Sequence, residues 1–314
     1  MSNTPLPAWT KVHDTLCAHG TSPFWHPREE RLYWIDAGLR RLWRVHPRSG
    51  AAEHLDLPQE PGSVVPCQKG GLLLAMRDGI YHLGSWSDLP RLVRPAPYDT
   101  SRQHFGEGRC DPWGRFWVGT RVDALDRADG ALYCLQTRTQ AQPELQLMER
   151  GALSSAGLAW SLDGRALYWA DASRHDIASH AMTQPGRWPP VLGVPMPWAR
   201  FPRKPEGWSF EHRLGYEGRP GGAALDQAGR YWVAMQEGAQ VLCLGERGEV
   251  LARYPVPAEC PTSVCFGGAG GQTLYVTTSR LHRSDAELRH YPDSGAVFSM
   301  PVGSAGQPTH LYWD

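Results

Sequence analysis

The sequence has no excess of either charge and no long apolar run. It contains 32 Lys and Arg residues against 32 Asp and Glu residues, so its formal net charge is zero. A protein that binds nucleic acid or an anionic membrane surface normally carries an excess of positive charge, and none is present here. No eighteen consecutive residues are apolar, and residues 1–20 contain no apolar segment of the signal-peptide type. We therefore expect a cytoplasmic protein without nucleic-acid or membrane partners.

Motifs typical of redox, metal and serine-hydrolase sites are also missing. No C-x-x-C pair occurs, and no G-x-S-x-G segment is present that would hold a nucleophilic serine. Because free cysteines are among the most buried residue types, we expect reduced core thiols and no catalytic thiolate. The seven cysteines are Cys17, Cys67, Cys110, Cys134, Cys243, Cys260 and Cys265.

Helical periodicity of useful length is absent, whereas turn-forming and aromatic residues are abundant. The chain contains 34 Gly, 27 Pro and 14 Trp, which is typical of many short strands joined by tight turns. One short strand pattern, rich in Leu, Tyr, Trp and Val, occurs six times, and Gly-containing turns precede most copies. The six copies are Arg31–Asp36, Gly71–Met76, Arg115–Thr120, Ala166–Asp171, Arg230–Met235 and Thr273–Thr278.

The spacing of these copies predicts the fold. Successive copies begin 40 to 64 residues apart, which fits one four-stranded blade per copy and is too long for a hairpin repeat. We predict an all-β, six-bladed β-propeller that forms a single domain over residues 1–314. A pair of β-sandwiches is the alternative, and it explains short strands but not a recurring strand sequence. We expect Trp9–His13 and His310–Trp313 to pair and close the last blade.

Several segments around these copies carry longer motifs. They are Gly20–Trp25, Cys110–Thr120, Ala156–Gly164, Arg219–Asp226 and Pro261–Gly268. Together with the first strand copy, they resemble the blade motifs of the gluconolactonase, senescence marker protein (regucalcin) and luciferin-regenerating enzyme family. The resemblance covers nearly the whole chain. It implies a six-bladed propeller with a small-molecule site in its central channel.

The resemblance also implies an altered metal site. In that family a Glu, an Asn and an Asp hold one divalent cation for the hydrolysis of sugar lactones, and the matching positions here are Thr21, Ala156 and Gly221. A methyl group and a hydrogen cannot coordinate a cation, and a single hydroxyl is a weak ligand. We therefore expect no metal and no cofactor at the family position. We expect these three residues to contact the substrate in a wider, less charged channel.

Without a metal, acid–base chemistry needs titratable side chains at the mouth of the channel. His104 and Glu107 match positions that bind the sugar in relatives, and Asp123 follows on a loop where relatives carry a substrate-contacting carboxylate. We predict that these three residues are catalytic. A satisfied polar pair in the ring is the alternative for His104 and Glu107. A cation recruited by Glu107 with Asp123 or His104 also remains open.

Other charged residues near the channel are candidates for substrate binding. We expect Arg121, Asp171 and Arg219 to contact the substrate, with Arg219 offering its guanidinium to an anionic group. The alternatives are a solvated loop for Arg121 and a turn cap for Asp171.

An insertion at about residues 196–218 interrupts the repeat between blades four and five, where the spacing grows by about 20 residues. It is rich in aromatic and charged residues, among them Trp198, Phe201 and Trp208. Because long loops in compact domains are often lids, we predict that it covers the channel mouth and that these three residues bind the substrate. An oligomer contact and plain decoration are the alternatives.

Two classes of function fit these features. The first is a metal-independent enzyme that acts on a cyclic small-molecule substrate, by lactone or ester hydrolysis or by acid–base cyclisation or isomerisation. The alternative is a non-catalytic small-molecule-binding relative of the sugar lactonases, favoured by the joint loss of three metal ligands. A protein-interaction propeller has the least support. We expect a monomer or a small homo-oligomer.

Overall fold

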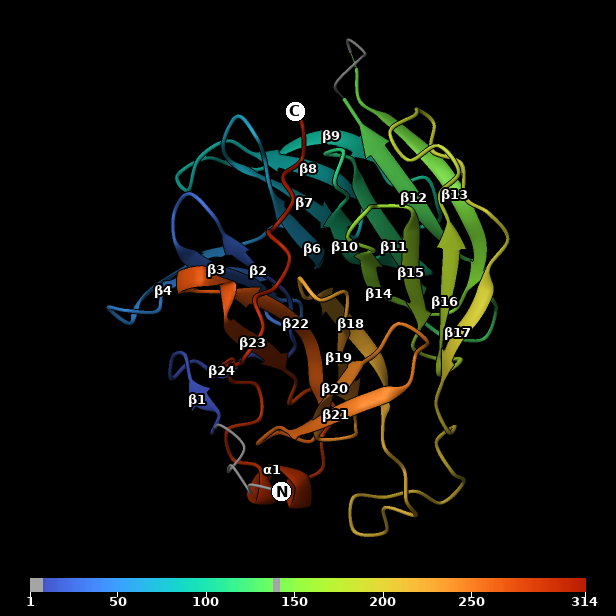
Figure 1. Cartoon of the computed structure of the whole chain (residues 1–314). Helices are drawn as coiled ribbons and strands as arrows, with labels where there is room; N and C mark the ends of the chain where they lie inside the picture. The colour runs from blue at the N-terminus through green and yellow to red at the C-terminus, as the bar shows by residue number, and fades with distance from the viewer. Residues whose placement is uncertain (1–7, 138–141) are drawn as a thin grey trace.

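The computed structural model describes residues 8–137 and 142–314, which fold into a ring of six antiparallel sheets. Each sheet has four strands, and the sheets follow one another around a central axis (Figure 1). The described residues contain one α-helix, α1 (Asp285–His290), and one 3-10 helix, η1 (Ala269–Gly271). Neither is long and apolar enough to cross a membrane. The prediction of an all-β, six-bladed propeller is confirmed.

In each blade the first strand named lies at the channel and the fourth lies at the outside of the ring. Blade one contains β2 (Gly20–His26), β3 (Arg31–Asp36), β4 (Arg41–His46) and β5 (Ala51–Asp56). Blade two contains β6 (Pro61–Pro66), β7 (Leu72–Met76), β8 (Gly79–Leu83) and β9 (Arg91–Pro95). Blade three contains β10 (Gln103–Cys110), β11 (Phe116–Val122), β12 (Gly130–Gln136) and β13 (Glu144–Ala152).

The second half of the ring repeats this plan. Blade four contains β14 (Ser155–Trp160), β15 (Ala166–Asp171), β16 (Asp176–Ala181) and β17 (Met196–Arg200). Blade five contains β18 (Arg219–Leu225), β19 (Tyr231–Gln236), β20 (Gln240–Leu244) and β21 (Val250–Pro255). Blade six contains β22 (Pro261–Gly267), β23 (Thr273–Thr278), β24 (Phe298–Pro301) and β1 (Thr10–Lys11).

The last blade closes the ring differently from the prediction. Its outer strand is the N-terminal β1, in which Thr10 lies opposite Ser299 of β24. The segment His310–Trp313 does not pair with β1. The partner of β1 is β24, and the segment lies next to blade two instead. That segment belongs to the C-terminal tail, residues 307–314, in which Tyr312 forms a parallel bridge with Cys67 next to blade two. The tail crosses the end of the channel that faces the viewer in Figure 1.

A buried aspartate fixes the turn between the inner two strands in blades three and five. Asp111 accepts hydrogen bonds from Arg115 Nε at 2.6 Å and from Trp117 Nε1 at 2.7 Å. Asp226 of blade five accepts the equivalent bonds from its own arginine and tryptophan, at 2.7 and 2.9 Å. A recurring D-x-x-G-R-x-W sequence therefore sets the turn and also anchors a core tryptophan. All seven cysteines are free and buried, as the sequence analysis predicted.

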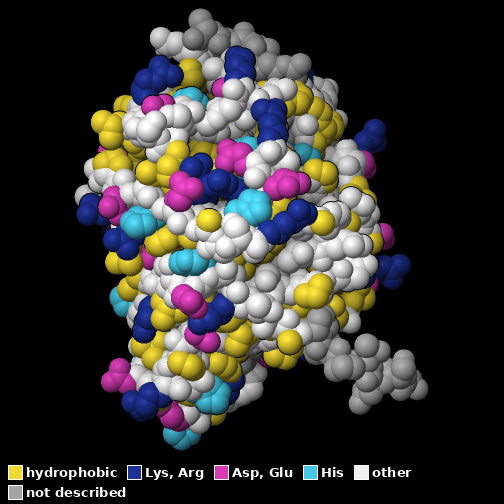
Figure 2. Space-filling model, turned by 90° about the vertical axis from the view of Figure 1, so that its left-hand side faces the viewer, with side chains coloured by type: hydrophobic (Ala, Val, Ile, Leu, Met, Phe, Trp, Pro, Cys, Tyr) yellow, Lys and Arg dark blue, Asp and Glu magenta, His cyan; other side chains and the backbone are white. Residues whose placement is uncertain are grey.

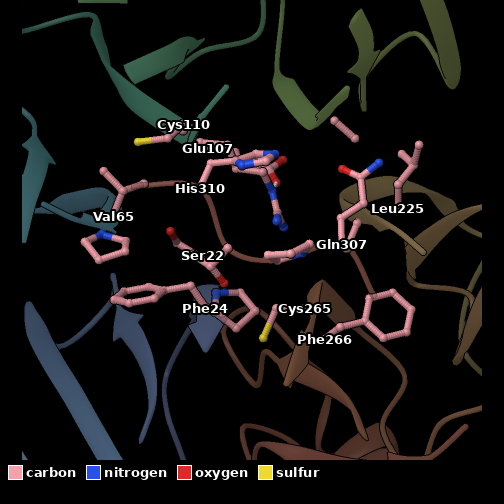
Figure 3. A pocket seen from close by; sticks show the side chains of 18 of the residues that line it. Ser22, Phe24, Val65, Glu107, Cys110, Leu225, Cys265, Phe266, Gln307 and His310 are labelled. Atoms are coloured by element: carbon pink, nitrogen blue, oxygen red, sulfur yellow. Dashed lines mark ion pairs between the residues drawn. The ribbon is translucent and has the colours of Figure 1, made fainter. Parts of the chain in front are cut away.

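Two cavities lie along the central axis, between the inner strands. The first, of about 70 Å³, is bounded by side chains such as Phe24 and Cys265 and by tail residues that include His310 (Figure 3). We refer to it as the tail-side cavity. The second, of about 330 Å³, lies where the inner strands begin, and we refer to it as the open cavity. Glu107 belongs to the wall of both.

The outer surface is electrostatically mixed. On the side of the ring shown in Figure 2, basic, acidic and hydrophobic side chains are interspersed, without a broad patch of one charge. This agrees with the balanced composition of 32 basic and 32 acidic residues.

Candidate functional site

The open cavity gathers the channel-facing ends of several blades. His104 lies near the start of β10, and Arg121 lies directly opposite it on β11. Side chains on directly opposed residues of neighbouring strands project from the same face of the sheet. Asp123 follows β11, and its backbone N–H donates to the carbonyl of Arg102 at 2.9 Å. The fold thereby brings His104, Arg121 and Asp123 to one wall of the cavity.

A histidine–aspartate pair is the most defined polar feature of this wall. His104 Nδ1 lies 2.7 Å from Asp123 Oδ1. A carboxylate can only accept, so Nδ1 carries the proton and Nε2 of the neutral ring holds a lone pair. Burial lowers the pKa of His104 and outweighs the opposing effects of the carboxylates of Glu60 and Asp123. The imidazole is thus a neutral base at neutral pH, and no described residue hydrogen-bonds to its Nε2.

Arg77 supports this pair from the neighbouring blade. Its guanidinium donates to Glu60 Oε2 at 2.7 Å, to Asp123 Oδ2 at 3.0 Å and to the carbonyl of Thr100 at 3.0 Å. Burial of Asp123 opposes its negative charge, but the hydrogen bonds from Arg77 and His104 prevail and lower the pKa of Asp123. The carboxylate therefore stays ionised and holds the imidazole in one orientation.

Glu107 is less exposed to solvent than His104. It is 9% exposed, and its Oε2 accepts the backbone N–H of Gly157 from β14. Arg109 Nε lies 3.7 Å from its Oε1. Burial raises the pKa of Glu107, and the charge of Arg109 is the main opposing influence. The β-bulge between Phe105 and Gly108 sets its direction, so that it faces the axis between the two cavities.

Two further arginines reach the open cavity. Arg219 begins β18, and its Nε lies 3.3 Å from Oε1 of Gln236. Its Nη1 is 3.8 Å from a Glu237 oxygen.

The side chain of Arg121 forms no hydrogen bond or ion pair with any described residue. Burial, and then the positive charge of Arg219, lowers the pKa of Arg121. His19 lines the same cavity, and burial followed by the charge of Arg121 lowers its pKa to about 4.

The donor set of the cavity does not fit the divalent cation of the family. Thr21 and Ala156 line the cavity, but only Thr21 has a side-chain oxygen. Gly221 has none, and a Cβ at this position would lie 2.4 Å from the carbonyl oxygen of Thr262. The carboxylates of Glu60 and Asp123 are already bound to Arg77.

The distribution of possible metal ligands leads to the same conclusion. Among residues 8–137 and 142–314, one group of three His, Cys, Asp or Glu side chains has its ligand atoms within 4.8 Å of one another. It consists of Cys67, His82 and Asp314, none of which lines the open cavity. A hard cation needs several oxygen ligands at one point, and the cavity does not present them.

The other proposed binding residues lie away from this wall. Asp171 accepts backbone N–H groups of Leu153 at 2.9 Å and Ser173 at 3.0 Å, which is the geometry of a turn cap. It lines a separate surface cavity together with Arg174. It does not line the open cavity, so its proposed contact with substrate stays a prediction without geometric support.

The insertion also lies outside the cavity wall. Its first residues form β17, the outer strand of blade four, and Trp198 Nε1 there donates to the carbonyl of Glu246 at 2.9 Å. Lys204 binds Glu237 at 3.0 Å and stands 4.0 Å over the ring of Trp208. Phe201 packs against the core between blades four and five. None of these insertion residues lines the open cavity.

Several cavity residues were absent from the sequence-based set, although a signal for them exists. The residue that follows each copy of the recurring strand lines the cavity in five of the six blades. These residues are Ala37, Arg77, Arg121, Gln236 and Ser279. Only Arg121 was singled out from the sequence. The repeat register alone was sufficient to find the others, because equivalent positions of a propeller face the same end of the channel.

Comparisons with known proteins agree with this architecture. The family described as "SMP-30/Gluconolactonase/LRE-like region" matches residues 19–280. The chain is 37% identical over 293 residues to a 6-deoxy-6-sulfogluconolactonase of Pseudomonas putida, covering 93% of this chain and 94% of that protein. It is 31% identical to pentonolactonase XacC of Haloferax volcanii, covering 95% and 96% of the two chains. The solved structure of a calcium-binding regucalcin from Agrobacterium tumefaciens superimposes with a TM-score of 0.86 at 21% identity, over 98% of this chain and 97% of that one.

Proposed function

Because the chain belongs to the SMP-30/gluconolactonase/LRE-like family, we propose that it hydrolyses a sugar lactone in the open cavity without a divalent cation. The observation that carries this proposal is the 2.7 Å hydrogen bond between His104 Nδ1 and Asp123 Oδ1. A histidine held in this way can act as a neutral, oriented base, and it lines the same cavity as Thr21 and Ala156. Relatives that cover more than nine tenths of the chain are named as sugar lactonases, which supports lactone hydrolysis as the reaction class.

The proposed reaction uses His104 first as a base and then as an acid. Nε2 removes a proton from a water molecule while the water oxygen attacks the lactone carbonyl. The tetrahedral intermediate then collapses, the ring C–O bond breaks, and the imidazolium returns the proton to the departing alkoxide. The products are the open hydroxy acid and the regenerated neutral imidazole.

The neighbours of His104 act through charge and position. Asp123 accepts the Nδ1–H and stabilises the imidazolium that forms transiently, and Arg77 keeps that carboxylate ionised and fixed. Negative charge that develops on the carbonyl oxygen would lie in a cavity lined by guanidinium groups. Ala156 and Gly106 leave space in the wall for a sugar ring.

The first prediction concerns the base itself. Hydrolysis of a panel of aldonolactones and acidic sugar lactones, followed as acid release, should persist in the presence of a chelator. His104→Gln and Asp123→Asn should each lower kcat/KM at least about 100-fold, the usual contribution of a general base. A His46→Gln variant, on the outer side of blade one, is the matched control and should retain full activity.

Each alternative has its own outcome. Loss of activity in chelator that added Ca²⁺ or Mn²⁺ restores would overturn the metal-independent mechanism while leaving the lactonase assignment intact. Tight binding of lactones without turnover would instead support the non-catalytic relative, which the loss of three family ligands also fits.

A further inference from the structure

Arg121 stands out among the arginines that line the open cavity. Its neighbour Arg77 binds two carboxylates, and Arg283 binds Glu237 at 3.1 Å and Glu287 at 3.4 Å. The side chain of Arg121, on the same cavity wall, has no hydrogen-bond or ion-pair partner among the described residues. A half-buried guanidinium that no protein group neutralises gains free energy when an anion binds it.

A second arginine converges on the same space. Arg219 comes from blade five, and both arginines line the open cavity. The charge of Arg219 is the strongest unfavourable electrostatic influence on Arg121. Arg219 is itself only loosely satisfied, with one hydrogen bond of 3.3 Å and one contact of 3.8 Å. Two like charges facing one cavity repel each other until an anion lies between them.

The rest of the cavity does not supply that anion. Asp123 and Glu60 exert favourable electrostatic effects on Arg121, but their oxygens are hydrogen-bonded to Arg77. Gln236 completes the polar setting, because its Oε1 accepts from Arg219 and its amide N–H₂ is left to donate. The geometry is therefore that of an anion site with two guanidinium groups and an amide.

We propose that Arg121 and Arg219 bind a permanently anionic substituent of the lactone, such as a phosphate, sulfonate or second carboxylate. The identity of the ligand as a lactone rests on the proposed function, whereas the binding of an anion does not. Arg121 is the direct cross-strand neighbour of His104, so a bound substituent would hold the lactone ring close to the base. The substrate class is then acidic sugar lactones, and neutral aldonolactones bind poorly.

The test uses two stable sugar acids that differ in one group. 6-Phosphogluconate and gluconate share a carboxylate and hydroxyl chain, and only the first has the phosphate. Calorimetry with the full-length protein should show at least tenfold tighter binding of 6-phosphogluconate. Arg121→Gln and Arg219→Gln should remove most of that preference. Arg253→Gln is the matched control, because Arg253 lies on the outer strand of blade five and binds Glu217.

Inorganic sulfate provides an independent readout that requires no sugar. An anion that binds only the native state raises the melting temperature by mass action. Sulfate, compared with chloride at equal ionic strength, should raise the melting temperature of the native protein more than that of Arg121→Gln. Equal melting shifts, together with equal affinity for the two sugar acids, would overturn the anion site.

The experiment separates this inference from the proposed hydrolysis. His104→Gln should lose turnover and yet keep the preference for 6-phosphogluconate. A native protein that shows the preference without hydrolysing any lactone would leave the anion site standing and refute the hydrolase. A native protein that hydrolyses neutral and phosphorylated lactones with the same kcat/KM would refute the anion site and support the hydrolase.

Discussion

At the scale of single residues, the site depends on contacts that join different blades. Thr21 and Ala156 line the open cavity, which is the channel position that the family-like motifs implied for them. The bond between His104 and Asp123 spans 19 residues and depends on the path of the loop after β11. The contact of Arg77 with Asp123 spans 46 residues and two blades. The repeat register places Arg77 at the cavity, but no local pattern encodes its contact with Asp123.

The pH profile should report the environment of His104. Its pKa lies below the ordinary value because of burial, and in the proposed mechanism the deprotonated ring is the active form. The kcat/KM for a lactone should therefore rise with pH through the acid range and be level at neutral pH. Glu60 is the strongest influence that raises this pKa, so Glu60→Gln should move the midpoint to lower pH. A midpoint that stays unchanged would mean that another group controls the profile.

At the scale of elements, the turns were readable from the sequence and the insertion was not. The D-x-x-G-R-x-W segments encode their turn locally, because each aspartate binds the arginine and the tryptophan of its own segment. The insertion was recognised by its length, but its aromatic and charged side chains had many possible partners. Arg213 forms an ion pair with Glu259, which lies just before β22 of blade six. The ring centroids of Phe210 and His290 of α1 are 5.4 Å apart. These distant partners decide where the segment lies.

The two equivalent turns provide a stability prediction with an internal control. The Arg115 side chain is 2% exposed, whereas the Arg230 side chain is 36% exposed. Asp111→Ala leaves a buried guanidinium without its carboxylate and should lower the free energy of unfolding by about 3–5 kcal/mol. Asp226→Ala should cost less, because water can solvate Arg230. Urea unfolding of both variants checks this order, and equal losses would show that burial of the arginine is not decisive.

At the scale of the whole molecule, the repeat spacing was sufficient to predict six blades but not the path of the C-terminal tail. The number of blades follows from the repeat spacing. The tail contains no repeat, and individual hydrogen bonds fix its position. Its backbone N–H groups donate to Leu225 of blade five, Pro66 of blade two and Gly114 next to blade three. The tail therefore ties together three blades that are not all neighbours.

Removing the tail should open the tail-side cavity. Cys110 and Cys265 line this cavity and are 5% and 3% exposed. In a chain that ends at Gly306, a thiol reagent should label both at least tenfold faster than in the full chain, as mapped by mass spectrometry. Cys243 lines neither axial cavity and should keep its labelling rate. Uniformly faster labelling of all three would indicate general loosening of the fold instead.

The positions of Glu107 and the tail have a consequence for how a ligand enters and leaves the open cavity. The tail crosses one end of the axis, and Glu107 lies in the wall between the two cavities. The open cavity is therefore accessible from one end only. In the proposed reaction, a lactone would enter and its acid product would leave through the same opening, so the two could not pass each other. Ring opening would add a carboxylate next to the arginines of the cavity wall. Release of the product would then limit turnover as much as the breaking of the ring.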